Sequence, residues 1–303
     1  MREMIKKTKI DFMGKRYFAL SFTAIMMIIG LLAVVQVARG TANLGIDFAG
    51  GTAVQIKFKT PVLLHDVRAT LEGGGITGFE LQELPTEGKV LISIKKSKGD
   101  LGDLSKKIIS LLSQKFSESN VVVDSTTEIG PKVGSKLKDD AVWAVIAAMI
   151  GILIYIAFRF QIRFGIGATI ATFHDVLAVL GVFYLMGKEI NLMLVSALLM
   201  IAGYSLTDTV VVFDRIREDM RTKFKKTAFE IVNESINEVL SRTLITSLTT
   251  LFTAIALFIF GGEVIHDFAL AIMVGIIIGT YSSIFVASPI VLMLGKDKPA
   301  VKK

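Results

Sequence analysis

The sequence predicts an α-helical membrane protein with six transmembrane helices and one small α+β domain between the first two of them. Hydrophobic residues make up 52% of the 303 residues, and they are concentrated in six runs of roughly 20 residues, the length that spans a bilayer. A stretch of about a hundred residues after the first run has the composition of a soluble domain. The chain has no cysteine, which excludes a disulfide framework and a thiolate metal site.

The first apolar run covers residues 17–37 and follows a basic segment, residues 1–16. The run is longer than the apolar region of a signal peptide, and no small-residue cleavage site follows it. We therefore expect a retained first helix. The basic leader places the N-terminus in the cytoplasm.

Residues 38–140 are expected to form an extracytoplasmic domain, because their apolar periodicity alternates between that of strands and that of helices. The predicted elements, in chain order, are strand 52–58, helix 62–71, strand 79–84, strand 89–95, helix 101–116 and strand 120–128. This βαββαβ order is that of the ferredoxin-like fold. The fold by itself does not indicate a function.

The five further spans are predicted at residues 141–158, 164–186, 190–213, 243–260 and 268–294. Residues 214–242 are expected to be a cytoplasmic loop, and its later part reads as an amphipathic helix at the membrane surface or against the bundle. Residues 295–303 form the predicted cytoplasmic tail.

Lysine and arginine residues cluster at the N-terminus, after the second and fourth runs, and in the tail. By the positive-inside rule, both termini are cytoplasmic and residues 38–140 lie outside a bacterial plasma (inner) membrane. The net charge of +7 is then explained by the basic residues at the ends of the apolar runs, which set the topology. We expect contact with the lipid bilayer and none with nucleic acid.

Asp208 lies inside the fourth apolar run, six residues before Asp214 opens the charged segment. It is thus about 9 Å along a helix from the water-facing end. A carboxylate there costs several kcal/mol unless it is paired, hydrated or protonated, and such residues usually have a function. The first hypothesis is that Asp208 exchanges a proton with one side of the membrane. The structural alternative is a carboxylate that hydrogen-bonds Ser205 or Thr207 and holds helices together.

Arg242, at the cytoplasmic start of the fifth run, is the predicted partner of Asp208. A buried ion pair that loses its charge on protonation is a two-state element. An arginine at the inner end of a helix is also a common topology anchor, which is the alternative for Arg242. Thr246, one turn further along, is predicted to support the site.

His174 and Asp175 are adjacent near the middle of the third run. Their side chains project about 100° apart on a helix, so they do not both face one neighbour squarely. A second proton site and a polar contact that packs the third helix against the fourth are equally weighted hypotheses.

The segment after the first helix contains Phe48, Gly50, Gly51 and Thr52. A glycine pair before a strand usually marks a tight turn or a close backbone approach. We expect it also to supply flexibility as a hinge between the outer domain and the membrane.

No HExxH, P-loop, GxSxG or CxxC motif is present, so the familiar hydrolase, nucleotide and zinc signatures are missing. The sequence therefore predicts no enzyme activity, no metal site and no cofactor.

Taken together, these features resemble the SecD/SecF family of bacterial protein-export membrane subunits, on its SecF side, over nearly the whole chain. The matching segments are residues 45–52, 130–134, 174–176, 203–209, 213–218 and 242–247. The fourth helix is also similar to that of resistance-nodulation-division efflux pumps, the broader superfamily.

The resemblance implies a SecD-like partner and a pseudo-symmetric unit of twelve helices. This unit would use the proton motive force to pull unfolded preproteins outward after SecYEG and SecA have started them. By the same resemblance, Asp208 matches the essential intramembrane aspartate and Arg242 the functional arginine. The coupling ion would be H⁺, with Na⁺ left open.

Two other functions compete with this one. A small-molecule efflux half-pump of the same superfamily is disfavoured because such pumps normally carry much larger outer domains. A scaffold that stabilises the translocon without proton coupling is the third hypothesis. An Asp208→Asn variant separates the three.

Overall fold

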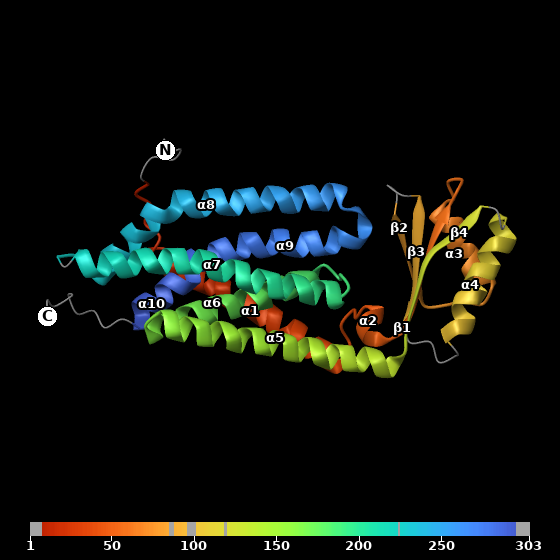
Figure 1. Ribbon diagram of the computed structural model, residues 1–303, viewed down its shortest axis with the longest axis horizontal. Helices are drawn as coiled ribbons and strands as arrows, with labels where there is room; N and C mark the ends of the chain where they lie inside the picture. The colour runs from red at the N-terminus through yellow and green to blue at the C-terminus, as the bar shows by residue number, and fades with distance from the viewer. Residues whose placement is uncertain (1–7, 85–87, 96–100, 118–119, 224, 295–303) are drawn as a thin grey trace.

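The protein consists of a bundle of long helices with a separate sheet domain at one end (Figure 1). The structure is a computed structural model, and it describes residues 8–84, 88–95, 101–117, 120–223 and 225–294. The long helices are α1 (Arg16–Arg39), α5 (Pro131–Arg159), α6 (Ile162–Leu185), α7 (Leu192–Thr222), α8 (Ala228–Phe260) and α9 (Gly262–Ser282). A π-helical segment, η1 (Ser283–Ala287), joins α9 to α10 (Ser288–Leu294) without a break. Six helical segments of the described chain are long and apolar enough to span a membrane, which confirms the predicted number.

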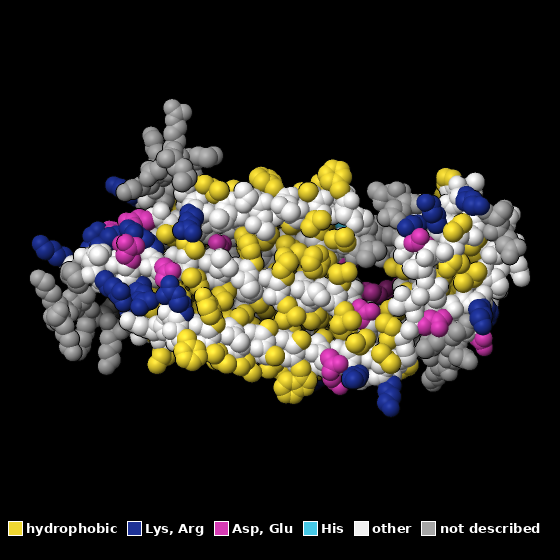
Figure 2. Space-filling model, viewed as in Figure 1, with side chains coloured by type: hydrophobic (Ala, Val, Ile, Leu, Met, Phe, Trp, Pro, Cys, Tyr) yellow, Lys and Arg dark blue, Asp and Glu magenta, His cyan; other side chains and the backbone are white. Residues whose placement is uncertain are grey.

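The surface of the bundle has the charge distribution that a bilayer requires. Hydrophobic side chains cover its length, and lysine and arginine gather at the end far from the sheet domain (Figure 2). Large apolar side chains point outward along it, such as Trp143, which is 67% exposed, and Phe158, which is 90% exposed. Apolar patches of this extent require lipid or a protein partner.

The sheet domain contains β1 (Gly51–Phe58), α3 (Leu64–Gly73), β2 (Phe79–Leu84), β3 (Lys89–Lys95), α4 (Leu101–Phe116) and β4 (Val121–Ile129). Its strands are antiparallel in the order β2-β3-β1-β4, which confirms the βαββαβ prediction. Side chains of one sheet face, such as Ile56 and Ile92, pack against α3 and α4 through Val67 and Leu112. The opposite face is turned toward the bundle (Figure 1).

A short helix that the sequence did not predict, α2 (Ile46–Ala49), precedes β1. Phe48 of this helix and Leu44 before it belong to the hydrophobic core of the bundle. Residues 44–49 are therefore attached to the membrane part, and the sheet domain begins at Gly51.

The predicted loop at residues 214–242 is wrong in its extent. Helix α7 continues to Thr222, and α8 begins at Ala228 with a capping box between Thr227 and Glu230. The expected amphipathic helix is thus the first part of α8. Its apolar side chains, such as Ile236, pack against the bundle, and this buried contact favours helix over loop.

The predicted start of the second span is also too late. Helix α5 begins at Pro131, where proline suits the first helical position, so residues 131–140 belong to this helix rather than to the sheet domain. The last described part of the basic N-terminal segment is held by α8: Asn233 accepts hydrogen bonds from the backbone of Phe12 and Met13 at 2.8 and 3.1 Å. Residues 1–7 and the predicted tail, residues 295–303, lie outside the described residues.

Candidate functional site

Asp208 of α7 is buried between three helices and is 6% exposed. Its Oδ2 accepts a hydrogen bond from the hydroxyl of Ser247 on α8 at 3.1 Å. The hydroxyl of Thr280 on α9 in turn donates to Ser247 Oγ at 2.8 Å. A chain of hydrogen bonds therefore links α7, α8 and α9 at the carboxylate, and we call these three residues the Asp208 cluster.

The predicted ion pair between Asp208 and Arg242 is not formed in this structure. Arg242 is exposed on α8, and no carboxylate of the described residues lies within ion-pair distance of its guanidinium. The reason is the continuity of α8. Thr243 and Ser247 face the bundle interior, and Arg242 lies five residues before Ser247, which turns it about 140° away on a helix.

Asp175 of α6 forms a second buried site with 0% exposure. Its Oδ2 accepts hydrogen bonds from the hydroxyls of Ser205 on α7 and Ser282 on α9, the latter at 2.8 Å. Its Oδ1 lies 2.9 Å from Nδ1 of His174. We call these four residues the Asp175 cluster. His174 is 1% exposed, and its Nε2 has no hydrogen-bond partner among the residues that the structure describes.

The supporting residues predicted around Asp208 are distributed differently. The Ser205 hydroxyl donates to Asp175 instead of Asp208. The Thr207 hydroxyl is exposed and donates to the carbonyl of Gly203 at 3.2 Å. The Thr246 hydroxyl lies 2.9 Å from the carbonyl of Thr243 and 3.1 Å from that of Arg242, and it also contributes a hydrogen bond to Asp208.

Sequence reasoning missed Ser247, Thr280 and Ser282. The signal was present, because residues 279–283 read Gly-Thr-Tyr-Ser-Ser within the sixth apolar run. Hydroxyl side chains inside transmembrane helices commonly bond across to neighbouring helices. The π-helix η1 begins directly after Ser282, and such irregular turns are frequent at functional sites.

The glycine pair at the start of the sheet domain is required by close backbone approach. Gly50 has φ +73°, and a Cβ there would lie 2.8 Å from Cα of Pro131. A Cβ on Gly51 would overlap the carbonyl oxygen of Ile94. Phe48 and Thr52 on either side are buried at 6% and 0% exposure.

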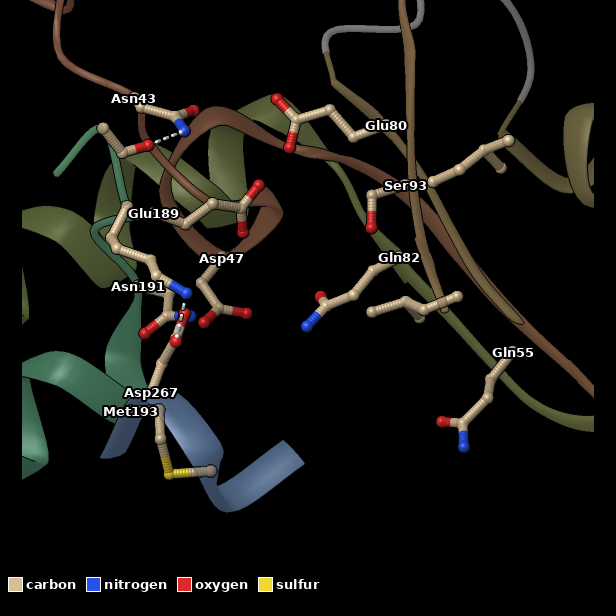
Figure 3. A pocket seen from close by; sticks show the side chains of 14 residues that line it. Asn43, Asp47, Gln55, Glu80, Gln82, Ser93, Glu189, Asn191, Met193 and Asp267 are labelled. Carbon is tan, nitrogen blue, oxygen red and sulfur yellow. Dashed lines mark hydrogen bonds and ion pairs between the residues drawn. The ribbon is translucent and has the colours of Figure 1, made fainter. Parts of the chain in front are cut away.

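A polar cavity of about 510 Å³ lies between the sheet domain and the bundle. Figure 3 shows side chains from both parts around it. The sheet contributes Gln55, Glu80, Gln82 and Ser93, and the bundle side contributes Asp47, Glu189, Asn191 and Asp267. Among the residues that the structure describes, no group of three or more histidine, aspartate or glutamate side chains is placed to hold a metal ion.

Residues 109–297, which contain both buried clusters, match the family described as "Protein export membrane protein SecD/SecF, C-terminal". Residues 42–62 match the "SecD/SecF GG Motif", which includes Gly50 and Gly51. The chain belongs to the SecD/SecF family.

Two curated relatives place it on the SecF side of that family. Protein translocase subunit SecF of Thermodesulfovibrio yellowstonii is 57% identical over 299 residues, which cover 98% of both chains. The protein of the same name from Vibrio alginolyticus is 39% identical over 300 residues, covering 98% of this chain and 94% of the relative. The chain is a SecF-type translocase subunit, a multi-pass transport protein of protein translocation and not an enzyme.

Solved structures of SecDF share the fold. The crystal structure of SecDF from Thermus thermophilus, described as a translocon-associated membrane protein, matches with a TM-score of 0.79 and 37% identity. SecDF in a super-membrane-facing form matches with a TM-score of 0.68 and 38% identity. Each match covers 95% of this chain but 39% of the SecDF chain, so this chain spans well under half of that protein. The family and these structures imply an association of SecD and SecF parts.

Proposed function

We propose that this SecF-type subunit, with a SecD-like partner, uses the proton motive force to drive late stages of Sec-dependent preprotein export. SecYEG and SecA would start the unfolded preprotein across the plasma membrane, and this unit would complete its transfer. The observation that carries the proposal is Asp208, a buried carboxylate inside the bundle that accepts a hydrogen bond from the neutral hydroxyl of Ser247.

An ionised carboxylate in this position is costly, and binding of a proton removes the cost. Because Ser247 and Thr280 connect Asp208 to α8 and α9, a change in its charge alters contacts among three helices. One charge moved through 100 mV is worth about 2.3 kcal/mol. Protons are therefore able to bias a switch of a few kcal/mol between two helix arrangements.

The SecD-like partner is proposed to cover the face of α7 and α8 that carries Arg242. Arg242 and Thr207 are exposed there, as are Thr246, Thr249 and Thr253 further along α8. An arginine turned toward lipid within the hydrocarbon region is strongly disfavoured. A partner that supplies an acceptor for Arg242 removes this cost, and Arg242 then acts across the subunit interface.

The proposed orientation places the sheet domain outside and both chain ends in the cytoplasm of a bacterium. Lysine and arginine side chains gather at the bundle end that lies opposite the sheet domain (Figure 2), which supports this orientation by the positive-inside rule.

The role of the Asp175 cluster is proposed as positioning. Asp175 accepts hydrogen bonds from Ser205 on α7 and Ser282 on α9, and these two helices also form the Asp208 cluster. It therefore sets the register of the helices around Asp208. The alternative is that His174 and Asp175 form a second proton site, and an Asp175→Asn variant distinguishes this role from positioning.

The proposed function is tested with Asp208→Asn in membrane vesicles that export a preprotein under an imposed proton gradient. Asp214→Asn is the matched control, since Asp214 lies on the same helix with a side chain that is 48% exposed. We expect Asp208→Asn to lose gradient-dependent export and Asp214→Asn to retain it. Normal export by Asp208→Asn would identify a scaffold, and a loss of drug resistance with normal export would identify an efflux pump. Replacement of the proton gradient by a sodium gradient identifies the coupling ion.

A further inference from the structure

The outer end of α7 is bound to the segment that precedes the sheet domain. The backbone N–H of Ile190 donates to the carbonyl of Asn43 at 2.8 Å, and the N–H of Gly45 donates to the carbonyl of Ile190 at 3.0 Å. Asp47 Oδ2 accepts from the N–H of Leu192, the first residue of α7, at 3.0 Å. A carboxylate is favourable at the N-terminus of a helix, so Asp47 positions this end of α7.

The sheet domain is joined to the bundle by two covalent connections that lie side by side. One is the pair Gly50 and Gly51, and the other runs from Ile129 through Gly130 into α5. Gly51 and Ile129 are partners in neighbouring strands. Two adjacent connections define an axis about which the sheet domain can rotate unless other contacts hold it.

Lys95 provides a third attachment. Its Nζ lies 2.9 Å from Glu80 Oε1 on the neighbouring strand, 2.8 Å from Glu189 Oε1 in the turn between α6 and α7, and 2.6 Å from Asn43 Oδ1. We call the bonds of Lys95 to Glu189 and Asn43 the outer contact. They join the sheet to the bundle side and restrain rotation about the axis.

The outer contact itself is made by charged and amide groups, which water can solvate when the contact opens. The adjoining cavity is lined mainly by amide and carboxylate side chains from both parts (Figure 3). The charged groups that face it are Asp47, Glu80, Glu189, Asp267 and Lys188, and Lys188 is paired with Asp267 at 2.8 Å. Carboxylates are thus in excess around Lys95.

This excess keeps Lys95 charged. Burial lowers the pKa of Lys95, but its hydrogen bonds to Glu189 and Glu80 outweigh burial and raise the pKa above the usual value. The side chains of Lys95 and Glu189 are 21% and 29% exposed, so water reaches the ion pair, and bonds of this kind break and re-form readily.

We propose that the outer contact opens and re-forms during each transport cycle and transmits displacement of α7 to the orientation of the sheet domain. The inference rests on the proposed function, because the displacement would originate at Asp208. Asp208 lies 16 residues from Leu192 along the same continuous helix, a span of about 24 Å. A shift of α7 therefore moves Glu189 and Asn43, which lie beside its first turn and are linked to it through Ile190, and Lys95 releases or recaptures them.

The first test links the contact reversibly. Cysteines introduced by Ser93→Cys and Met193→Cys, which line the adjoining cavity from the sheet and from α7 and leave Lys95 and Glu189 in place, are joined by a bis-methanethiosulfonate reagent in the full complex of this cysteine-free chain. We expect gradient-dependent export to stop and to return after reduction. Normal export by the fully linked protein would overturn the proposal.

The second test weakens the contact without a link. Lys95→Met removes the charge, and Lys95→Arg keeps it. Lys89→Met is the matched control, since Lys89 lies on the same strand and pairs with Asp124, 3.0 Å away within the sheet domain. Spin labels at Thr127 and Met186 report the distance between sheet domain and bundle.

We expect Lys95→Met to increase the population of displaced sheet domains by about three- to five-fold, and Lys95→Arg and Lys89→Met to resemble the wild type. Equal distance distributions for Lys95→Met and Lys89→Met would overturn the proposal. The two proposals fail separately. If Asp208→Asn loses export and the linked protein exports normally, only the proposal on the outer contact is rejected. If Asp208→Asn exports normally, the proposed function itself is rejected.

Discussion

Ser247 of α8 donates a hydrogen bond to Asp208 of α7 across 39 positions of sequence, at 3.1 Å. This bond joins the two helices that the short link at residues 223–227 connects. It also makes the local environment of the carboxylate depend on how α8 packs against α7.

The Ser247 bond predicts a non-additive pair of substitutions. We expect Ser247→Ala to reduce gradient-dependent export, because Asp208 loses a hydroxyl donor, and Ser247→Thr to retain it. In an Asp208→Asn background, Ser247→Ala should cause no further loss, since the two residues act as one unit. Export assays on the two single variants and the double variant measure this. Losses that simply add would show that Ser247 acts independently of Asp208.

Substitutions at Asp175 separate its two possible roles. Asp175→Ala leaves the hydroxyls of Ser205 and Ser282 without their buried acceptor, so we expect a loss of about 1–3 kcal/mol per unsatisfied group. Asp175→Asn keeps an acceptor oxygen and should retain most of the stability and export. Thermal unfolding in detergent and export assays check both. A stable Asp175→Asn protein without export would instead assign a proton-handling role to Asp175.

Helix α1 packs closely against α6 at Gly30 of α1 and Gly181 of α6. A Cβ on Gly30 would overlap the backbone carbonyl of Leu177, whereas a Cβ on Gly203 would meet no atom of the described residues within 4 Å. We expect Gly30→Ala to destabilise the bundle by about 1–3 kcal/mol through overpacking. Gly203→Ala, the matched control on α7, should be neutral or slightly stabilising in the isolated chain. Equal melting temperatures for the two variants would contradict the packing.

Gly51→Ala is expected to disrupt the sheet, because the added methyl group would overlap the carbonyl oxygen of Ile94 on the neighbouring strand. The comparison is Gly73→Ala at the end of α3, where a Cβ would have no neighbour within 4 Å in the described part of the chain. Limited proteolysis of the outer domain measures the effect. Protection of the Gly51→Ala domain equal to wild type would show that β1 and β3 tolerate a wider separation.

The proposed orientation is tested by labelling single cysteines in this chain. Thr127 is exposed on β4 and Thr222 is exposed at the end of α7. In whole cells whose outer membrane has been permeabilised, Thr127→Cys should react with a maleimide that does not cross the plasma membrane. Thr222→Cys should react only after the plasma membrane is opened. The reverse pattern would invert the topology.

The sequence by itself determined the fold class, because hydropathy and apolar period are local properties. Six apolar runs and one βαββαβ pattern were sufficient for the bundle and the sheet domain. It also identified Asp208 and Asp175 as buried carboxylates, since an acidic residue inside an apolar run has few other environments. The start of α5 at residue 131 and the end of α7 at residue 222 were missed, because segments next to a span become helical only when their apolar faces find a core to pack against.

The partners of each carboxylate were decided by the tertiary structure. Asp208 bonds Ser247 rather than Arg242, and Ser205 bonds Asp175 rather than Asp208. These bonds join residues 39 and 30 positions apart on different helices, and the rotation of each helix about its own axis is set by its packing against all of its neighbours. A rotation of one residue's angle, about 100°, exchanges an inward hydroxyl for an outward arginine, and no local pattern in the sequence specifies that rotation.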